Sequence, residues 1–220
     1  MADDAHPQRM SRRAPYAFTC RRCLRCCRHK KIQVNPYEVA QLAAHVGVTT
    51  TVFIRRHTIE GGSFLRFGDD GACPFLTEKG CGVHESRPLV CRLYPLGRHV
   101  ADSGEEWFAE LQGEPGCEGT RLGKSSVLQY LSEQGAWPFM RAADLYLDLY
   151  WRLSAALESE RKSCLLRGAA DLSWTDLDAA VGCFCRERSC REPVSLDDRM
   201  AIHICAIETW AQLPSKGGYR

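Results

Sequence analysis

The chain has 220 residues, a net charge of +2, 45% hydrophobic residues and 25% charged residues, which is ordinary for a soluble globular protein with a packed core. No apolar run approaches the ~20 residues that would span a bilayer, and no apolar stretch follows the first arginines as it would in a secretion signal. We therefore expect a cytoplasmic location and no membrane partner.

The first part of the chain is strongly basic. Between Ala5 and Tyr37 it carries nine Lys or Arg residues and no Asp or Glu, and we call this stretch the basic arm. Residues 1–16, which overlap the start of this arm, are polar and contain Pro7 and Pro15, which predicts a mobile tail. The charge of the arm predicts an unidentified protein or another anionic partner, and a nucleic acid is a further alternative.

Two short helices are expected next. Asn35, Pro36 and Glu38 are typical of a helix start with Asn35 as the cap, and Gly47 would end this helix. Thr49–Thr51 can cap the second helix. Because the second helix is basic and follows a glycine turn, the pair resembles a helix-turn-helix and supports the nucleic-acid alternative. Two helices that pack against the cysteine-rich core are the other interpretation.

Short hairpins and one short helix follow. Residues 76–81 (LTEKGC) have hairpin chemistry with Gly80 at the turn. Residues 86–88 (SRP) open a short helix that Pro95 must end. A second hairpin is expected around residues 102–104 (DSG).

From Lys124 onward the pattern is helical, with four predicted helices. Ser195 and Asp198 form a cap-like pair at the last of them. The sequence therefore predicts the α+β class. A small cysteine-rich metal-binding domain with short helices and β-hairpins occupies residues 17–122, and a helical C-terminal subdomain occupies residues 123–220.

The cysteines carry the chemistry. Thirteen of them are unusual in a reducing compartment, where structural disulfides are not expected, and the odd number also argues against a full disulfide framework. The remaining uses are metal ligation, redox chemistry and burial as small apolar side chains. Eight lie in the first 117 residues: Cys20, Cys23, Cys26, Cys27, Cys73, Cys81, Cys91 and Cys117.

The spacing within residues 20–27 (CRRCLRCC) indicates metal ligation. A C-x-x-C pair lets two thiolates converge on one ion, and two such spacings share Cys23. The side chains of Cys26 and Cys27 are neighbours that usually diverge, so these two are better placed to serve two sites or different atoms of one cluster. Eight thiols suffice for two four-ligand sites, or for one cluster with spare thiols.

The identity of the metal is less constrained. Cysteine sites suit both zinc and iron–sulfur clusters. A contiguous run with single cysteines far downstream is more typical of cluster ligation than of a zinc finger. We therefore expect an iron–sulfur cluster, of the 4Fe-4S kind or similar, with zinc or mononuclear iron as the alternative.

CRRCLRCC, followed by CPFLTEKGCGVHESRPLVCRLYPLG and PGC, resembles the YkgJ-type CxxCxxCC cysteine-cluster family over about residues 18–120. That family is described as zinc- or iron-chelating and sometimes as iron–sulfur proteins. The resemblance implies a redox or metal-handling role. It implies as metal ligands Cys20, Cys23, Cys26, Cys27, Cys73, Cys81 and Cys91, with Cys117 in addition. A flagellin lysine N-methylase is similar over the same motif, which leaves a lysine N-methylase-like enzyme as an alternative, but no glycine-rich S-adenosylmethionine loop is found.

Two arginines and one histidine lie close to these cysteines in the sequence. Arg87 and Arg92 flank Cys91 and could stabilise a negatively charged centre, although ion pairs with acidic neighbours are the alternative interpretation. His84 follows Cys81 at ligand spacing, but the resemblance gives it no required role.

The downstream cysteines lie in helical sequence. Positions two apart on a helix point roughly 200° apart, so a C-x-C pair there would not converge on one ion. We expect core or incidental thiols at Cys164, Cys183, Cys185, Cys190 and Cys205.

Overall fold

The computed structural model describes residues 8–101, 103–158 and 174–213. It forms two compact units, and each unit joins two separate stretches of the chain. The first, which we call the cysteine unit, consists of Met1–Lys30 and Phe67–Pro138. The second, the helical unit, consists of Lys31–Arg66 and Phe139–Arg220. The sequence predicted two consecutive domains with a boundary at residues 122/123, whereas each of these units consists of two stretches that alternate along the chain.

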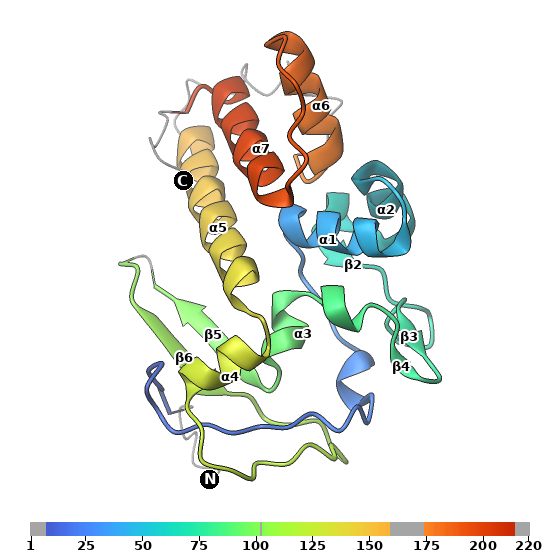
Figure 1. Cartoon of the computed structure of the whole chain (residues 1–220), viewed down its shortest axis with the longest axis vertical. Coiled ribbons are helices and arrows are strands. Elements are labelled where there is room, and N and C mark those ends of the chain that lie inside the picture. Colours follow the sequence, from blue (N-terminus) through green and yellow to red (C-terminus); the bar gives the residue numbers. More distant parts are fainter. Residues whose placement is uncertain (1–7, 102, 159–173, 214–220) are drawn as a thin grey trace. The chain divides into compact units, whose positions relative to one another are not determined.

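The cysteine unit contains short helices and two antiparallel hairpins (Figure 1). Its elements are η1 (Arg25–Cys27), β3 (Leu76–Thr77), β4 (Gly80–Cys81), η3 (His84–Ser86), α3 (Leu89–Leu93), β5 (Leu96–Val100), β6 (Glu106–Glu110) and α4 (Val127–Glu133). The helical unit contains α1 (Pro36–Val46), α2 (Thr50–His57), β1 (Thr58–Ile59), η2 (Glu60–Gly62), β2 (Phe64–Leu65), most of α5 (Trp137–Glu158), α6 (Leu177–Glu187) and α7 (Leu196–Trp210). The mixture of helices and small two-stranded sheets confirms the predicted α+β class.

The predicted helix start at Asn35 is confirmed in atomic detail. The Asn35 side chain accepts a hydrogen bond from the Glu38 N–H at 3.0 Å, and the Glu38 carboxylate accepts one from the Asn35 N–H at 2.9 Å. These two bonds form a capping box, which satisfies two N–H groups that the first turn of a helix leaves unpaired. Gly47 ends α1 with a φ of 72°, a left-handed conformation that glycine adopts at little cost.

The other predicted element boundaries are also found. Residues 76–81 form the β3–β4 hairpin, and β5 pairs with β6 around residues 101–105. The short helix α3 ends at Leu93, before Pro95. Ser195 caps α7, where its hydroxyl accepts a hydrogen bond from the Asp198 N–H at 3.1 Å. Local turn and cap chemistry therefore decides most of these boundaries.

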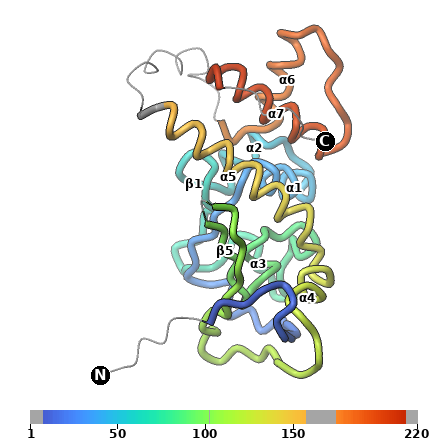
Figure 2. The backbone as a smooth tube through the Cα atoms, turned by 90° about the vertical axis from the view of Figure 1, so that its left-hand side faces the viewer, coloured from blue at the N-terminus to red at the C-terminus, as the bar shows by residue number. Residues whose placement is uncertain are grey.

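The described part of the predicted tail is paired with the cysteine unit (Figure 2). Met10 and Phe108 exchange two backbone hydrogen bonds of 2.7 and 2.8 Å, and the Val127 N–H donates to the Ala14 carbonyl at 3.0 Å. Tyr16 is buried and meets the Tyr130 ring edge-on at 5.0 Å. The chain from Met10 to Tyr16 is therefore part of the packed unit.

The helical unit includes α1 and α2 because they pack on the C-terminal helices α6 and α7. Thr50, at the start of α2, is buried and donates its hydroxyl to Asp176 at 2.5 Å. The Thr50 N–H donates to the Asp178 carboxylate at 2.9 Å, and the Asp178 N–H donates to the Thr50 hydroxyl at 2.9 Å. The helix pair thus packs on α6 and α7 within the helical unit.

Among the helices of the described residues, none has both the length and the apolar character that crossing a lipid bilayer requires.

Candidate metal centre

All eight cysteines of the first half of the chain belong to the cysteine unit. They come from the N-terminal run and from four later positions, with the whole 31–66 stretch of the helical unit inserted between the two groups. Of the eight, Cys20 and Cys91 are exposed and the other six are half-buried. The fold therefore gathers into one unit the thiols that the spacing singled out.

The backbone of the N-terminal cysteine run has an unusual conformation. Arg22, Leu24 and His29 all have positive φ angles, of 54°, 65° and 54°, although none of them is glycine. Leu24 immediately precedes the 3₁₀ turn η1, so a left-handed residue is followed by a right-handed one. Such pairs turn successive N–H groups toward one side and create the anion-binding concavity that many iron–sulfur and phosphate sites use.

Backbone pairing carries Cys73 and Cys81 to the end of this run. The Cys73 N–H donates to the Cys27 carbonyl at 2.9 Å, and the His29 N–H donates to the Gly71 carbonyl at 2.7 Å. Cys81 then lies opposite Leu76 in the β3–β4 hairpin, directly after Cys73. The negative charges of Cys73 and Cys81 contribute to the raised pKa of the Cys27 thiol.

A separate pairing carries Cys117 to the front of the run. Thr19 and Thr120 exchange two backbone hydrogen bonds of 2.9 and 3.1 Å. The Cys117 N–H donates to the Glu114 carbonyl at 2.9 Å, which closes the turn predicted at residues 115–119. Through the Thr19–Thr120 pairing, the turn that holds Cys117 returns to the chain just before Cys20.

Cys26 connects the two groups. Its thiolate accepts a hydrogen bond from Cys27, which is the main reason that the pKa of Cys26 is lowered to about 7, while burial acts in the opposite direction. The same hydrogen bond, followed by burial and the negative charges of Cys26, Cys73 and Cys81, raises the pKa of Cys27 far above its usual value. For Cys23, burial raises the pKa, but the N–H groups of residues 118 and 25 and the Cys117 thiol lower it by more. Six thiols thus form one electrostatic network.

Cys20 and Cys91 occupy the margin of this network. The Cys20 sulfur accepts a hydrogen bond from the Arg22 N–H at 3.4 Å, and its charge acts on Tyr130. Cys91 lies in the short helix α3 and is exposed. Neither is buried with the other six, so the full eight-thiol ligand set stays a prediction.

The cysteine thiols are chemically suitable metal ligands, although their side chains are not arranged in a coordination geometry. Within residues 8–101, 103–158 and 174–213, no three Cys, His, Asp or Glu side chains are placed so that they could hold a metal ion together. The donor set consists of soft thiols, which suit zinc, copper(I) and iron–sulfur clusters and not hard cations such as magnesium. The cysteines of the unit would supply these thiolate ligands.

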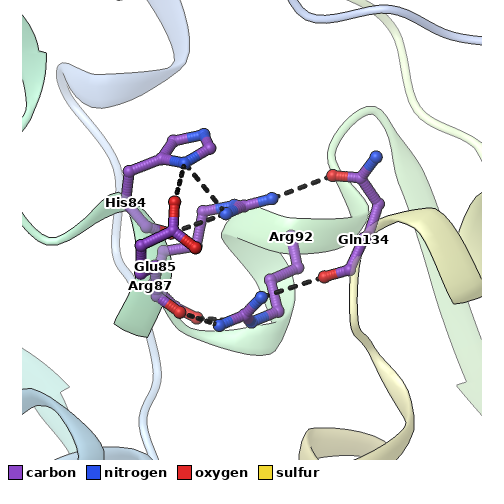
Figure 3. Close-up of polar contacts among 5 residues, drawn as sticks. All are labelled: His84, Glu85, Arg87, Arg92 and Gln134. Carbon is purple, nitrogen blue, oxygen red and sulfur yellow. Dashed lines mark hydrogen bonds and ion pairs between the residues drawn. The ribbon is translucent and has the colours of Figure 1, made fainter.

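The two arginines proposed to stabilise a negative centre make other contacts (Figure 3). Arg92 is 8% exposed, and its guanidinium donates to the backbone carbonyls of Arg87 at 3.0 Å, Gln134 at 2.9 Å and Glu85. Arg87 donates to the Gln134 side chain at 2.9 Å and to the His84 carbonyl at 2.5 Å. These contacts connect the segment before α3 to the end of α4. A role of Arg87 and Arg92 toward a metal stays a prediction.

Three residues beside the thiols were missed by the sequence analysis. The Tyr94 hydroxyl accepts a hydrogen bond from the Glu114 N–H at 2.7 Å, and Lys30 forms an ion pair with Glu114. Burial is the main reason that the pKa of Tyr94 is raised, and the charges of Cys117, Glu114 and Cys26 add to it. Tyr94 belongs to the C-R-x-Y-P-L part of the motif, so the motif itself was a signal for it.

The fold and the grouped thiols define a small cysteine-rich α+β protein of the metal-binding class. Residues 19–111 match the family CxxCxxCC, whose description is "Putative zinc- or iron-chelating domain". The resemblance to this family is confirmed for that stretch, which includes seven of the eight cysteines and ends before Cys117. No curated protein and no solved structure gives a significant match to the chain.

Proposed function

We propose that this protein ligates one or two iron–sulfur clusters through thiolates of the cysteine unit, in a redox or metal-handling role and in the cytoplasm. The observation that carries the proposal is the backbone pairing that brings Cys73 and Cys81 to one end of the cysteine run and Cys117 to the other. Six thiols exceed the four that one tetrahedral zinc ion or one iron–sulfur cluster binds, so they suffice for one site with spare thiols or for ligands shared between two sites.

The backbone of the cysteine run supports a cluster over a lone ion. A cluster with full thiolate ligation is an anion, and hydrogen bonds to its sulfurs stabilise it. The left-handed residues Arg22 and Leu24 turn N–H groups toward one side of the chain, and Arg21, Arg22 and Arg25 are exposed around them. When bound, the cluster would supply one-electron chemistry, while the cysteine unit would hold it and restrict water.

Purification without oxygen, followed by measurement of iron, zinc and acid-labile sulfide per chain and an absorption spectrum, tests the proposal. We expect iron and sulfide in about equal amounts and a broad visible absorption. Variants Cys27→Ser and Cys73→Ser should lose iron. The matched control Cys205→Ser, at a half-buried cysteine of the helical unit, should keep the full iron and sulfide content.

Zinc is the second candidate, because the family description names it. One zinc ion per chain with no sulfide, lost in the same two variants and kept in the control, would replace the cluster by a thiolate zinc site. No metal of either kind after reconstitution of the reduced protein would contradict metal binding itself.

The basic arm is proposed to bind an anionic protein partner next to the metal. Four arginines around the cysteine run are exposed, namely Arg21, Arg22, Arg25 and Arg28. Because attraction between exposed charges is screened by salt, such binding should weaken steeply as the salt concentration rises. Pull-down of a partner at low and high salt, with Arg21→Glu and Arg25→Glu as variants, tests this. Equal salt dependence for a DNA duplex would instead support the nucleic-acid alternative.

A further inference from the structure

A second group of thiols lies in the helical unit, at the end of α6, apart from the candidate metal centre. Of the five downstream cysteines, Cys164 lies outside the described residues. Cys183 is half-buried and its thiol donates to the Glu187 carboxylate at 3.5 Å. Cys185 is buried and Cys190 is exposed. As expected for positions two apart on a helix, Cys183 and Cys185 have different neighbours.

The chain folds back at the end of α6 and brings Cys190 to Cys185. The Cys190 N–H donates to the Cys185 carbonyl at 3.0 Å, and the Ser189 N–H donates to the Arg186 carbonyl at 3.2 Å. Ser189 has a φ of 52°, in the left-handed region. These two bonds and the left-handed residue make up a Schellman motif, which places the residue two after the helix cap directly against the last turn.

In most such motifs the contact across the turn is between apolar side chains. Here the two positions that this turn brings together, Cys185 and Cys190, both carry thiols. The Cys185 sulfur also lies 4.0 Å from the Arg191 carbonyl oxygen. On its other side, Cys185 packs with Ala40, Leu177 and Val181. One thiol is thus held in the core and its partner faces solvent.

We propose that Cys185 and Cys190 are a reversible redox pair that forms a disulfide across the end of α6 when a small-molecule disulfide is the oxidant. A disulfide requires Cα atoms about 4.4–6.8 Å apart and side chains that point at each other. The backbone hydrogen bond keeps the two residues adjacent, and in a Schellman motif the side chains at these two positions face each other. Cys183 is excluded because its thiol contacts Glu187.

The exchange proceeds in two steps that balance. The exposed Cys190 thiolate attacks the small disulfide, its S–S bond breaks, and one small thiolate leaves, which gives a mixed disulfide at Cys190. The Cys185 thiol then loses its proton to the solvent and attacks the Cys190 sulfur, and the second small thiolate leaves. In total two protein thiols are oxidised and one small disulfide is reduced to two thiols. In a reducing compartment the pair would be in the dithiol form at rest and would be cross-linked as the oxidant rises.

The test uses the full chain, purified without oxygen, with its metal retained. The protein is equilibrated with glutathione disulfide in the presence of micromolar reduced glutathione, the remaining thiols are alkylated, and tryptic peptides are analysed by mass spectrometry. Trypsin cleaves after Arg186, Arg188 and Arg191, so a Cys185–Cys190 bond joins two otherwise separate peptides. We expect this joined species, lighter by two hydrogens than its parts, and its disappearance after treatment with dithiothreitol.

The joined species should exceed the mixed glutathione disulfide at Cys190 by at least about tenfold, because a tethered thiol acts at a millimolar or higher effective concentration. The matched control Cys183→Ser should give the same yield, while Cys190→Ser should give none. Cys185→Ala should stop at the mixed disulfide. A stable mixed disulfide at Cys190 in the wild-type protein, a link from Cys190 to Cys183, or full alkylation of both thiols would overturn the proposal.

Discussion

Replacement of Arg92 by methionine is expected to destabilise the cysteine unit by about 3–5 kcal/mol. The buried guanidinium donates to three backbone carbonyls, at residues 85, 87 and 134. A hydrogen bond that involves a charged group contributes about 1.5–3 kcal/mol net, and three such bonds from one side chain add less than fully. Methionine has an apolar side chain similar in size to the aliphatic part of arginine. The lost free energy of unfolding would therefore reflect backbone carbonyl groups that are buried without a hydrogen-bond donor.

This experiment separates two roles for Arg92. Denaturant unfolding of the metal-free protein gives the total loss, and hydrogen exchange assigns it to amides of the cysteine unit rather than of the helical unit. Arg92→Lys keeps the charge but not the three-way geometry, and should lose about 2 kcal/mol. Arg121→Met, which removes an exposed ion pair with Glu110, should cost less than about 1 kcal/mol.

If Arg92→Met left the unfolding free energy and the amide protection unchanged but lowered the metal content, the reasoning from Figure 3 would be refuted. The sequence-based role of Arg92, which is to stabilise a negatively charged metal centre, would then be the correct one. If both properties fell together, metal content measured per folded chain at low temperature would show whether the metal loss follows from unfolding.

Three further predictions concern other sites. Burial lowers the pKa of His203 to about 4, so the unfolded chain binds more protons than the folded chain below pH 6.5. The free energy of unfolding, measured by denaturant titration, should therefore fall by about 3 kcal/mol between pH 7 and pH 4. This loss should largely vanish in His203→Gln, whose side chain can still pair with the Tyr146 hydroxyl. If two independent sites are bound, Cys26→Ser and Cys27→Ser should each retain about half of the metal. For one cluster with spare thiols, one of the two variants should keep the full metal content and an unchanged absorption spectrum. Loss of all metal in both variants would contradict independent sites. Because Leu24 has a φ of 65°, Leu24→Gly should be more stable than Leu24→Ala by about 1 kcal/mol in thermal unfolding, and the reverse order would contradict backbone strain there.

The elements that could be predicted from sequence are those decided by local chemistry. The Asn35 cap, the glycine at residue 47 and the proline after α3 each act on neighbouring residues, and each boundary is found where it was expected. The C-x-x-C spacings indicated Cys20, Cys23 and Cys26 in the same way, whereas the four later cysteines were added by the family resemblance. Fold class and the candidate ligands of the cysteine run thus followed from contacts within a few residues along the chain.

The features of the fold that the sequence did not predict are those determined by contacts between residues far apart in the chain. No sequence pattern indicated that Thr50 would pair with Asp176, yet this buried contact joins the 31–66 stretch to the C-terminal helices. The backbone pairing of Cys190 with Cys185 was also not predicted, because a helical spacing argument does not apply once the chain reverses at Ser189. In both cases a turn or a polar pair determines which residues contact each other, and the periodicity of apolar residues does not.

The interleaving of the two units explains how thiols far apart in sequence can be adjacent before any metal binds. The chain leaves the cysteine unit after Lys30 and returns at Phe67, and the backbone bonds from His29 to Gly71 and from Cys73 to Cys27 join the two edges of this break. Closing the loop between them costs entropy that the helical unit offsets by packing its own core. These backbone bonds hold the two cysteine-bearing segments together, so the binding of a metal does not have to bring distant segments into contact. The free energy of ligation can therefore contribute to holding the strained cysteine run, where non-glycine residues have left-handed conformations.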